Sequence, residues 1–150
     1  MLKPRLVAEM ADAISSATNV PTTVKCRLGI NNEESYESLA NFINIVHRKG
    51  GVKHFIVHAR NAILDKNFSP DQNRCIPPLK YEYVYRLCRD FPHVRFTLNG
   101  GVKTYDDIKL HLKEGVSGVM VGRAAIQDPY YWKDVDSEIY GCISGNHVYY

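Results

Sequence analysis

The chain has 150 residues, of which 45% are hydrophobic and 23% are charged, and its formal net charge is +3. These values are typical of a globular domain with a core of its own and exclude a disordered protein. Apolar runs such as Phe55–Val57 are far shorter than the roughly 20 residues of a membrane helix, so no membrane contact is predicted. Lys3–Arg5 places charge and proline where a secretory signal would have an apolar run, and the four cysteines lack CxxC spacing. Both observations favour an intracellular protein, most simply in the cytoplasm, although an organelle stays open.

Segments with helical and strand patterns alternate along the chain. After Pro4, apolar residues at helical spacing predict a helix that ends near Thr18. The segments that follow are a strand at 22–28, a helix at 33–49, a strand at 55–58, a long turn-rich segment at 59–79, a helix at 81–91, a strand at 94–98, a helix at 104–113, a strand at 117–121 and a helical piece that opens at 122–123.

This alternation predicts an α/β fold whose strands pair in parallel through right-handed crossovers. Four strand–helix units make half of an eight-unit (β/α)8 TIM barrel, whereas a free-standing doubly wound sheet usually has five or more strands. We therefore expect a half-barrel that carries only the C-terminal four units. Such a half exposes the edges of its first and last strands and an apolar interior, which predicts aggregation or self-pairing.

The last two predicted strands end in glycine, where a barrel of this class commonly holds a phosphate. Asn99-Gly100-Gly101 and Gly122-Arg123 would let backbone N–H groups approach phosphate oxygens, and Arg123 adds a positive charge near a helix start. Each motif alone is also compatible with a simple tight turn. Their joint position on successive strands favours a phosphate site.

Two further candidates lie on the first two strands. Lys25 is flanked by Val24 and Cys26, and an inward-pointing lysine there needs a polar or anionic partner, although it could instead face solvent. His58 ends the second strand at the active face, where a purely structural histidine is the alternative. The other histidines lack metal-ligand spacing, so no metal site is predicted.

Taken in order, the residues at the strand ends form a series of short motifs. They are Pro21-x-Thr23-Val24-Lys25-Cys26-Arg27-Leu28-Gly29, His58-Ala59-Arg60, Ser69-Pro70-x-x-Asn73-Arg74-x-Ile76-Pro77-Pro78-Leu79, Asn99-Gly100-Gly101 and Val119-Met120-Val121-Gly122-Arg123. This series resembles the tRNA-dihydrouridine synthase family, and most closely its A-type branch. The resemblance runs from about Leu2 to Gly141, and the Ser69–Leu79 segment makes it specific.

The resemblance implies an oxidoreductase with FMN as cofactor and NADPH as reductant, which reduces the C5–C6 double bond of uridines in tRNA. Residues 1–141 would then be the second half of the catalytic barrel, and 142–150 an irregular tail. Lys25 and His58 are implied to contact the flavin ring. The implied FMN phosphate site consists of Asn99, Gly100, Gly101, Gly122 and Arg123.

The loop after the second strand is implied to face the tRNA through Arg60, Lys66 and Arg74, or else it is a solvated basic loop. Asp71 departs from the family, which often has a basic residue at this position. The departure matters because an acid there would repel a tRNA phosphate.

A larger departure is the absence of the family's general acid, a cysteine in an Asn-x-Gly-Cys-Pro motif. Cys26 is expected to point to the opposite face from Lys25, and Cys88 to lie on a helix away from the mouth. No catalytic residue is therefore assigned in this chain, and we expect it to be inactive alone and to need the missing barrel half or self-association.

Three other functions stay open. The chain could be a non-catalytic module that binds flavin or phosphate, an RNA-binding remnant that relies on Arg60, Lys66 and Arg74, or part of another FMN-dependent barrel such as a dihydroorotate dehydrogenase-like enzyme. The long Ser69–Leu79 loop argues against the last, because a small-molecule dehydrogenase has no evident use for a basic loop at the mouth.

Overall fold

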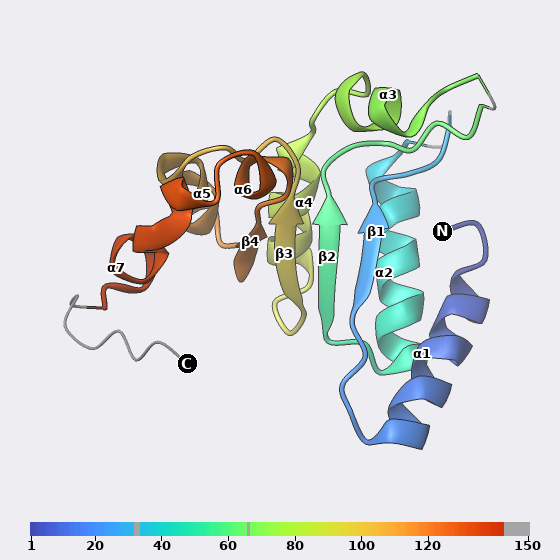
Figure 1. Cartoon of the computed structure of the whole chain (residues 1–150). Helices are drawn as coiled ribbons and strands as arrows, with labels where there is room; N and C mark the ends of the chain where they lie inside the picture. The colour runs from blue at the N-terminus through green and yellow to red at the C-terminus, as the bar shows by residue number, and fades with distance from the viewer. Residues whose placement is uncertain (32–33, 66, 143–150) are drawn as a thin grey trace.

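The computed structural model describes residues 1–31, 34–65 and 67–142 and shows an α/β fold built on one sheet of four parallel strands. The strands lie in chain order and are β1 (Val24–Arg27), β2 (His54–His58), β3 (Arg95–Asn99) and β4 (Gly118–Met120). The arrowheads of β1, β2 and β3 in Figure 1 point the same way, and β4 pairs with β3 in parallel, so the carboxyl ends of the strands share one edge. The predicted α/β class and parallel pairing are confirmed.

The helices precede, connect and follow these strands. They are α1 (Pro4–Thr18), α2 (Tyr36–Gly50), α3 (Pro70–Cys75), α4 (Tyr81–Asp90), α5 (Tyr105–Lys113), α6 (Arg123–Gln127), the 3-10 helix η1 (Tyr130–Asp134) and α7 (Val135–Tyr140). In Figure 1, α2 and α4 lie behind the sheet and α1 lies outside α2. Within the described ranges, no helix is long and apolar enough to cross a membrane.

Helix α3 was not predicted, because the segment 59–79 has no helical apolar period. A capping box forms it instead: the N–H of Gln72 donates to Ser69 Oγ over 3.2 Å, and the N–H of Ser69 donates to Gln72 Oε1 over 2.7 Å. Pro70 follows as the first helical residue, where its missing N–H costs nothing. The result is a short helix above the arrowheads of β1 and β2 (Figure 1).

The two faces of the sheet differ in chemistry because side chains alternate along each strand. The face covered by α2 and α4 is apolar, with Phe55 and Phe96 stacked and fully buried. We call the opposite face the inner face; by strand register it consists of Lys25, Arg27, His54, Ile56, His58, Arg95, Thr97, Asn99, Gly118 and Met120. The expectation of an apolar interior is therefore wrong for the four described strands, where only Ile56 and Met120 are apolar side chains.

Candidate functional site

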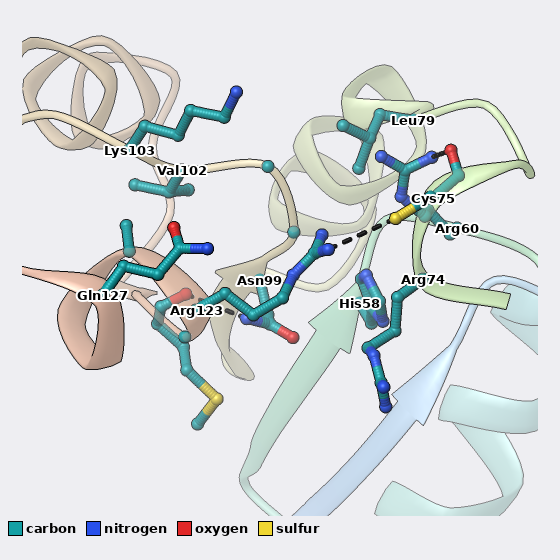
Figure 2. Close-up of a pocket in the computed structure, with 15 residues that line it drawn as sticks. His58, Arg60, Arg74, Cys75, Leu79, Asn99, Val102, Lys103, Arg123 and Gln127 are labelled. Carbon is teal, nitrogen blue, oxygen red and sulfur yellow. Dashed lines mark hydrogen bonds between the residues drawn. The ribbon is translucent and has the colours of Figure 1, made fainter. Parts of the chain in front are cut away.

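A pocket of about 560 Å³ opens at the carboxyl ends of β2, β3 and β4. It brings together most of the candidate residues, which come from separate elements: His58, Asn99, Gly100, Gly101, Gly122 and Arg123. Arg60 and Arg74 complete its side toward α3, as Figure 2 shows. Lys25 is not part of the lining, and Lys66 lies outside the described residues.

The turn after β3 requires its two glycines. Gly100 has a φ of +118° and Gly101 a φ of +75°, values that side-chain-bearing residues rarely adopt. Space is also short, since a Cβ on Gly100 would lie 2.8 Å from His58 Cδ2 and one on Gly101 2.6 Å from Leu79 Cδ1. Tyr81 fixes the turn by donating its hydroxyl to the carbonyl of Gly100 over 2.9 Å. The loop can therefore present bare backbone to the pocket.

The other glycine motif is more open. A Cβ on Gly122 would have no neighbour within 4 Å, so crowding inside the protein does not require glycine there. The lack of a side chain instead leaves the backbone of Gly122 open to close approach by a ligand. Gly122 immediately precedes α6 and offers no side-chain cap to its first N–H groups. Arg123 reaches across the pocket and donates to Cys75 Sγ over 3.2 Å (Figure 2).

Lys25 and Asn99 lie together on the inner face beside the pocket. Lys25 Nζ donates to Asn99 Oδ1 over 3.1 Å, and Asn99 Nδ2 donates to the carbonyl of Met120 over 2.9 Å. These bonds tie β1, β3 and β4 together at the level of the pocket floor. Burial lowers the pKa of Lys25. Its side chain is exposed and has Asn99 as a polar partner.

His58 is neutral at physiological pH. Burial, followed by the positive charges of Arg27 and Lys25, lowers the pKa of His58 to about 4. A neutral imidazole can donate a hydrogen bond from one nitrogen and accept one at the other. The pocket thus combines permanent positive charge with one uncharged donor and acceptor, which suits an anionic, hydrogen-bonding ligand.

The arginines near α3 are held by the protein itself. Arg60 donates through one guanidinium nitrogen to the carbonyls of Cys75, over 3.0 Å, and of Pro77. Arg74 forms an ion pair with Asp71, which partly neutralises its charge. The guanidinium of Arg60 therefore holds the loop in place, while that of Arg74 is the more exposed of the two.

The sequence reasoning missed Arg27, Cys75, Lys103 and Gln127. Arg27 donates to the carbonyls of Asn61 and Asn73, over 2.8 Å each, and so fastens α3 to β1. The others line the pocket. Gln127 could have been found from the sequence, since it follows Arg123 by one helical turn and so lies on the same face of α6.

The four cysteines are free and differ in environment. Cys26 belongs to the buried core, as its position beside Lys25 predicts, and burial raises the pKa of its thiol to about 12. Burial also raises the pKa of Cys88 on α4. Cys75 and Cys142 are exposed. Among the described residues, no three His, Cys, Asp or Glu side chains are placed to hold a metal ion.

Comparison with known proteins decides which family this arrangement belongs to. The family model described as dihydrouridine synthase (Dus) matches residues 1–142. The chain belongs to the dihydrouridine synthase family. The resemblance predicted from the sequence is confirmed.

Several bacterial proteins match this member of the dihydrouridine synthase family. It is 48% identical to the "tRNA-dihydrouridine(20/20a) synthase" of Vibrio cholerae over 141 residues, covering 94% of this chain and 42% of the relative. Proteins of the same name from Escherichia coli K12 (48% identical; 91% of this chain, 39% of the relative) and Synechocystis (46%; 93% and 41%) also match. The chain thus spans well under half the length of the curated relatives it matches.

Proposed function

We propose that this chain is the flavin-binding part of a tRNA-dihydrouridine synthase, which reduces uridine to dihydrouridine in tRNA with FMN as cofactor and NADPH as reductant. The observation that carries the proposal is the 45–48% identity to proteins named for this activity, over more than nine tenths of the chain. The cationic, glycine-edged pocket supports it independently, because it offers what a flavin phosphate needs.

The residues of the pocket fit FMN. The bare backbone at Gly100, Gly101 and Gly122, with the guanidinium of Arg123, would hold the phosphate. Lys25, which the hydrogen bond to Asn99 holds in position, would face the electron-rich edge of the flavin ring. When bound, FMN supplies hydride transfer between NADPH and the uracil ring. Neutral His58 would orient a ring by donating or accepting one hydrogen bond without adding charge.

The tRNA would approach over α3. Arg74 is exposed at the rim and suits a phosphate, and Lys66 is proposed to share this role by its place in the sequence. Arg60 would contribute by shaping the loop and by its positive charge, since its guanidinium is bonded to the carbonyls of Cys75 and Pro77. Asp71 weakens Arg74 as a phosphate ligand through their ion pair.

In this proposal, residues 1–141 form the C-terminal four strand–helix units of an eight-unit barrel. Within the described residues, no element covers the inner face of the sheet, and the outer edges of β1 and β4 have no neighbouring strand. Both features support the half-barrel, because four further strand–helix units would cover this face and pair with these edges. Residues 142–150 would be a tail beyond the barrel; 143–150 lie outside the described residues. A general-acid cysteine would come from the other half of the barrel.

The test is FMN binding by the 150-residue chain, which is measured through the quenching of flavin fluorescence. We expect the chain to bind FMN and the Arg123→Ala variant to bind about 10- to 100-fold more weakly, because a charge-assisted phosphate contact is lost. Arg89→Ala, on the exposed side of α4, is the matched control and should leave the affinity unchanged. Equal affinity of all three proteins, or no binding at all, would contradict the proposed phosphate site.

Uridine reduction needs a second assay. The chain alone, given FMN, NADPH and unmodified tRNA, should form no dihydrouridine, whereas the chain combined with the other barrel half should form it. Flavin binding without reduction in the combined protein would favour the alternative of a non-catalytic flavin-binding module.

A further inference from the structure

The turn after β3 carries two kinds of backbone N–H group. Those of Lys103 and Thr104 both donate to Asp107 Oδ2, over 2.8 and 3.0 Å, so the protein already uses them. No acceptor among the described residues takes the N–H of Gly101 or that of Val102. Both of these residues line the pocket. The turn can therefore offer the N–H groups of Gly101 and Val102 to a ligand.

Tyr81 sets the direction of the peptide that joins Gly100 to Gly101. Its hydroxyl donates to the carbonyl of Gly100 over 2.9 Å, and burial raises the pKa of Tyr81, which keeps the hydroxyl protonated as a donor. In a planar trans peptide, the carbonyl of one residue and the N–H of the next point in opposite directions. The N–H of Gly101 therefore points away from Tyr81. The pocket lining agrees, since it includes Gly100 and Gly101 but not Tyr81.

The ring of Tyr81 is itself fixed by neighbouring elements. Tyr81 is the first residue of α4, and the N–H of Lys80 just before it donates to the carbonyl of Ala59, directly after β2, over 2.9 Å. On its other side the ring packs edge-on against His111 of α5, with 4.5 Å between ring centroids, and His111 is buried. A ring held in this way loses little freedom when its hydroxyl forms a hydrogen bond. The hydroxyl can thus hold the Gly100 carbonyl in one direction.

Without this hydroxyl, the same peptide is free to rotate. It lies between two glycines, with φ of +118° and +75°, and glycine adopts both positive and negative φ. A rotated peptide would turn the Gly100 carbonyl toward the pocket. Its partly negative oxygen would then repel a phosphate, and the N–H donor of Gly101 would be lost to the ligand.

We infer that Tyr81 is a positioning residue of the phosphate site: by holding the Gly100 carbonyl, it keeps the N–H of Gly101 directed at the phosphate of a flavin mononucleotide, so that the site prefers FMN to the unphosphorylated riboflavin. This inference rests on the function proposed above. Tyr81 acts through the turn and does not line the pocket. Tyr85, one helical turn later on α4, bonds instead to His111 Nδ1 over 2.7 Å and has no contact of this kind with the turn.

The test compares the wild-type chain with Tyr81→Phe and with the matched control Tyr85→Phe. Each variant loses one hydrogen-bonded hydroxyl from α4 and keeps its ring. Circular dichroism checks that each variant is folded. The dissociation constants for FMN and for riboflavin are measured through the quenching of flavin fluorescence.

We expect Tyr81→Phe to bind FMN about five- to tenfold more weakly and to bind riboflavin as the wild type does, because only a donor to the phosphate is lost. Tyr85→Phe should bind both flavins like the wild type. A merely structural role would weaken both flavins alike, or would affect both variants equally. Either of these results, or an unchanged preference for FMN in Tyr81→Phe, would overturn the inference.

A titration of the wild-type chain with inorganic phosphate, followed by NMR of the backbone amides, needs neither a variant nor a flavin. The amide resonance of Gly101 should shift as phosphate is added, and those of Lys103 and Thr104 should shift less, because their N–H groups are bonded to Asp107. An unshifted Gly101 resonance would overturn the inference even if FMN binds. A shifted Gly101 resonance in a chain that binds neither flavin would support the inference and contradict the proposed function.

Discussion

Replacing Gly101 by alanine tests whether the turn after β3 is as tight as its geometry indicates. The residue has a φ of +75°, and an added Cβ would lie 2.6 Å from Leu79 Cδ1 and 2.7 Å from the hydroxyl oxygen of Tyr81. Leu79 can move by changing its rotamer. Tyr81 cannot move freely, because its hydroxyl is bonded to the carbonyl of Gly100.

Two costs add in this variant. A left-handed φ costs alanine about 1–2 kcal/mol relative to glycine. Crowding against Leu79 and Tyr81 adds about 1–3 kcal/mol, as for an overpacked core. The total of about 2–5 kcal/mol is a large share of the roughly 5–15 kcal/mol that stabilises a typical domain. We also expect weaker FMN binding, since the turn that would hold the phosphate must shift.

Gly115→Ala separates the two costs. Gly115 has a φ of +92°, but a Cβ there would have no neighbour within 4 Å, so only the backbone cost of about 1–2 kcal/mol applies. The free energy of unfolding is measured in urea for the wild type and both variants. If Gly101→Ala is destabilised no more than Gly115→Ala and binds FMN as the wild type does, the crowded turn is not a constraint and the reasoning fails.

Three further predictions concern charge and capping. The folded protein holds the pKa of His58 near 4, against 6.5 for an ordinary histidine, so the unfolded chain binds the extra proton between these values. The free energy of unfolding should therefore fall by about 1–2 kcal/mol as the pH drops from about 6.5 to about 4, since the ring is half-exposed. Urea unfolding at several pH values measures this pH dependence, and His58→Gln should remove the part that comes from His58. Asp71→Asn releases Arg74 from its ion pair and should tighten tRNA binding about two- to fivefold in filter binding; unchanged affinity would show that Arg74 does not meet phosphate. Thr104→Ala removes one half of the capping box of α5 and should cost about 1 kcal/mol in urea unfolding, whereas Thr104→Ser should cost little.

The alternation of strands and helices could be predicted because its signals are local. Pro4 begins α1, Gly51 ends α2 with a φ of 64°, and Thr104 caps α5, each at or within a residue of where the sequence indicates. Helix α3 escaped prediction because it buries no residue and so leaves no apolar period. Its Ser69 to Gln72 capping signature was nevertheless readable in the sequence. Local capping chemistry, where present, predicts such a helix better than periodicity.

The location of the candidate site could be predicted from the strand topology, whereas the hydrogen-bond partners of its side chains could not. Parallel strands bring their carboxyl ends to one edge, which is why His58, Asn99 and Arg123 meet in one pocket. The carbonyls that accept from Arg60 lie 15 and 17 residues further along, and those that accept from Arg27 lie 34 and 46 residues further along. No pattern in the sequence marks a carbonyl as available to a distant guanidinium.

The guanidinium groups of Arg27 and Arg60 contribute positive charge at and beside the pocket. Arg27 and Arg60 each donate through one guanidinium nitrogen to two backbone carbonyls, and these neutral acceptors do not cancel the positive charge. Arg74, paired with Asp71, loses part of its charge instead. Burial is the first cause of the lowered pKa of His58, and the charges of Arg27, Arg60 and other nearby cations lower it further. An anionic ligand would thus enter a positive field that the protein maintains through neutral acceptors, and its negative charge would itself raise the pKa of His58.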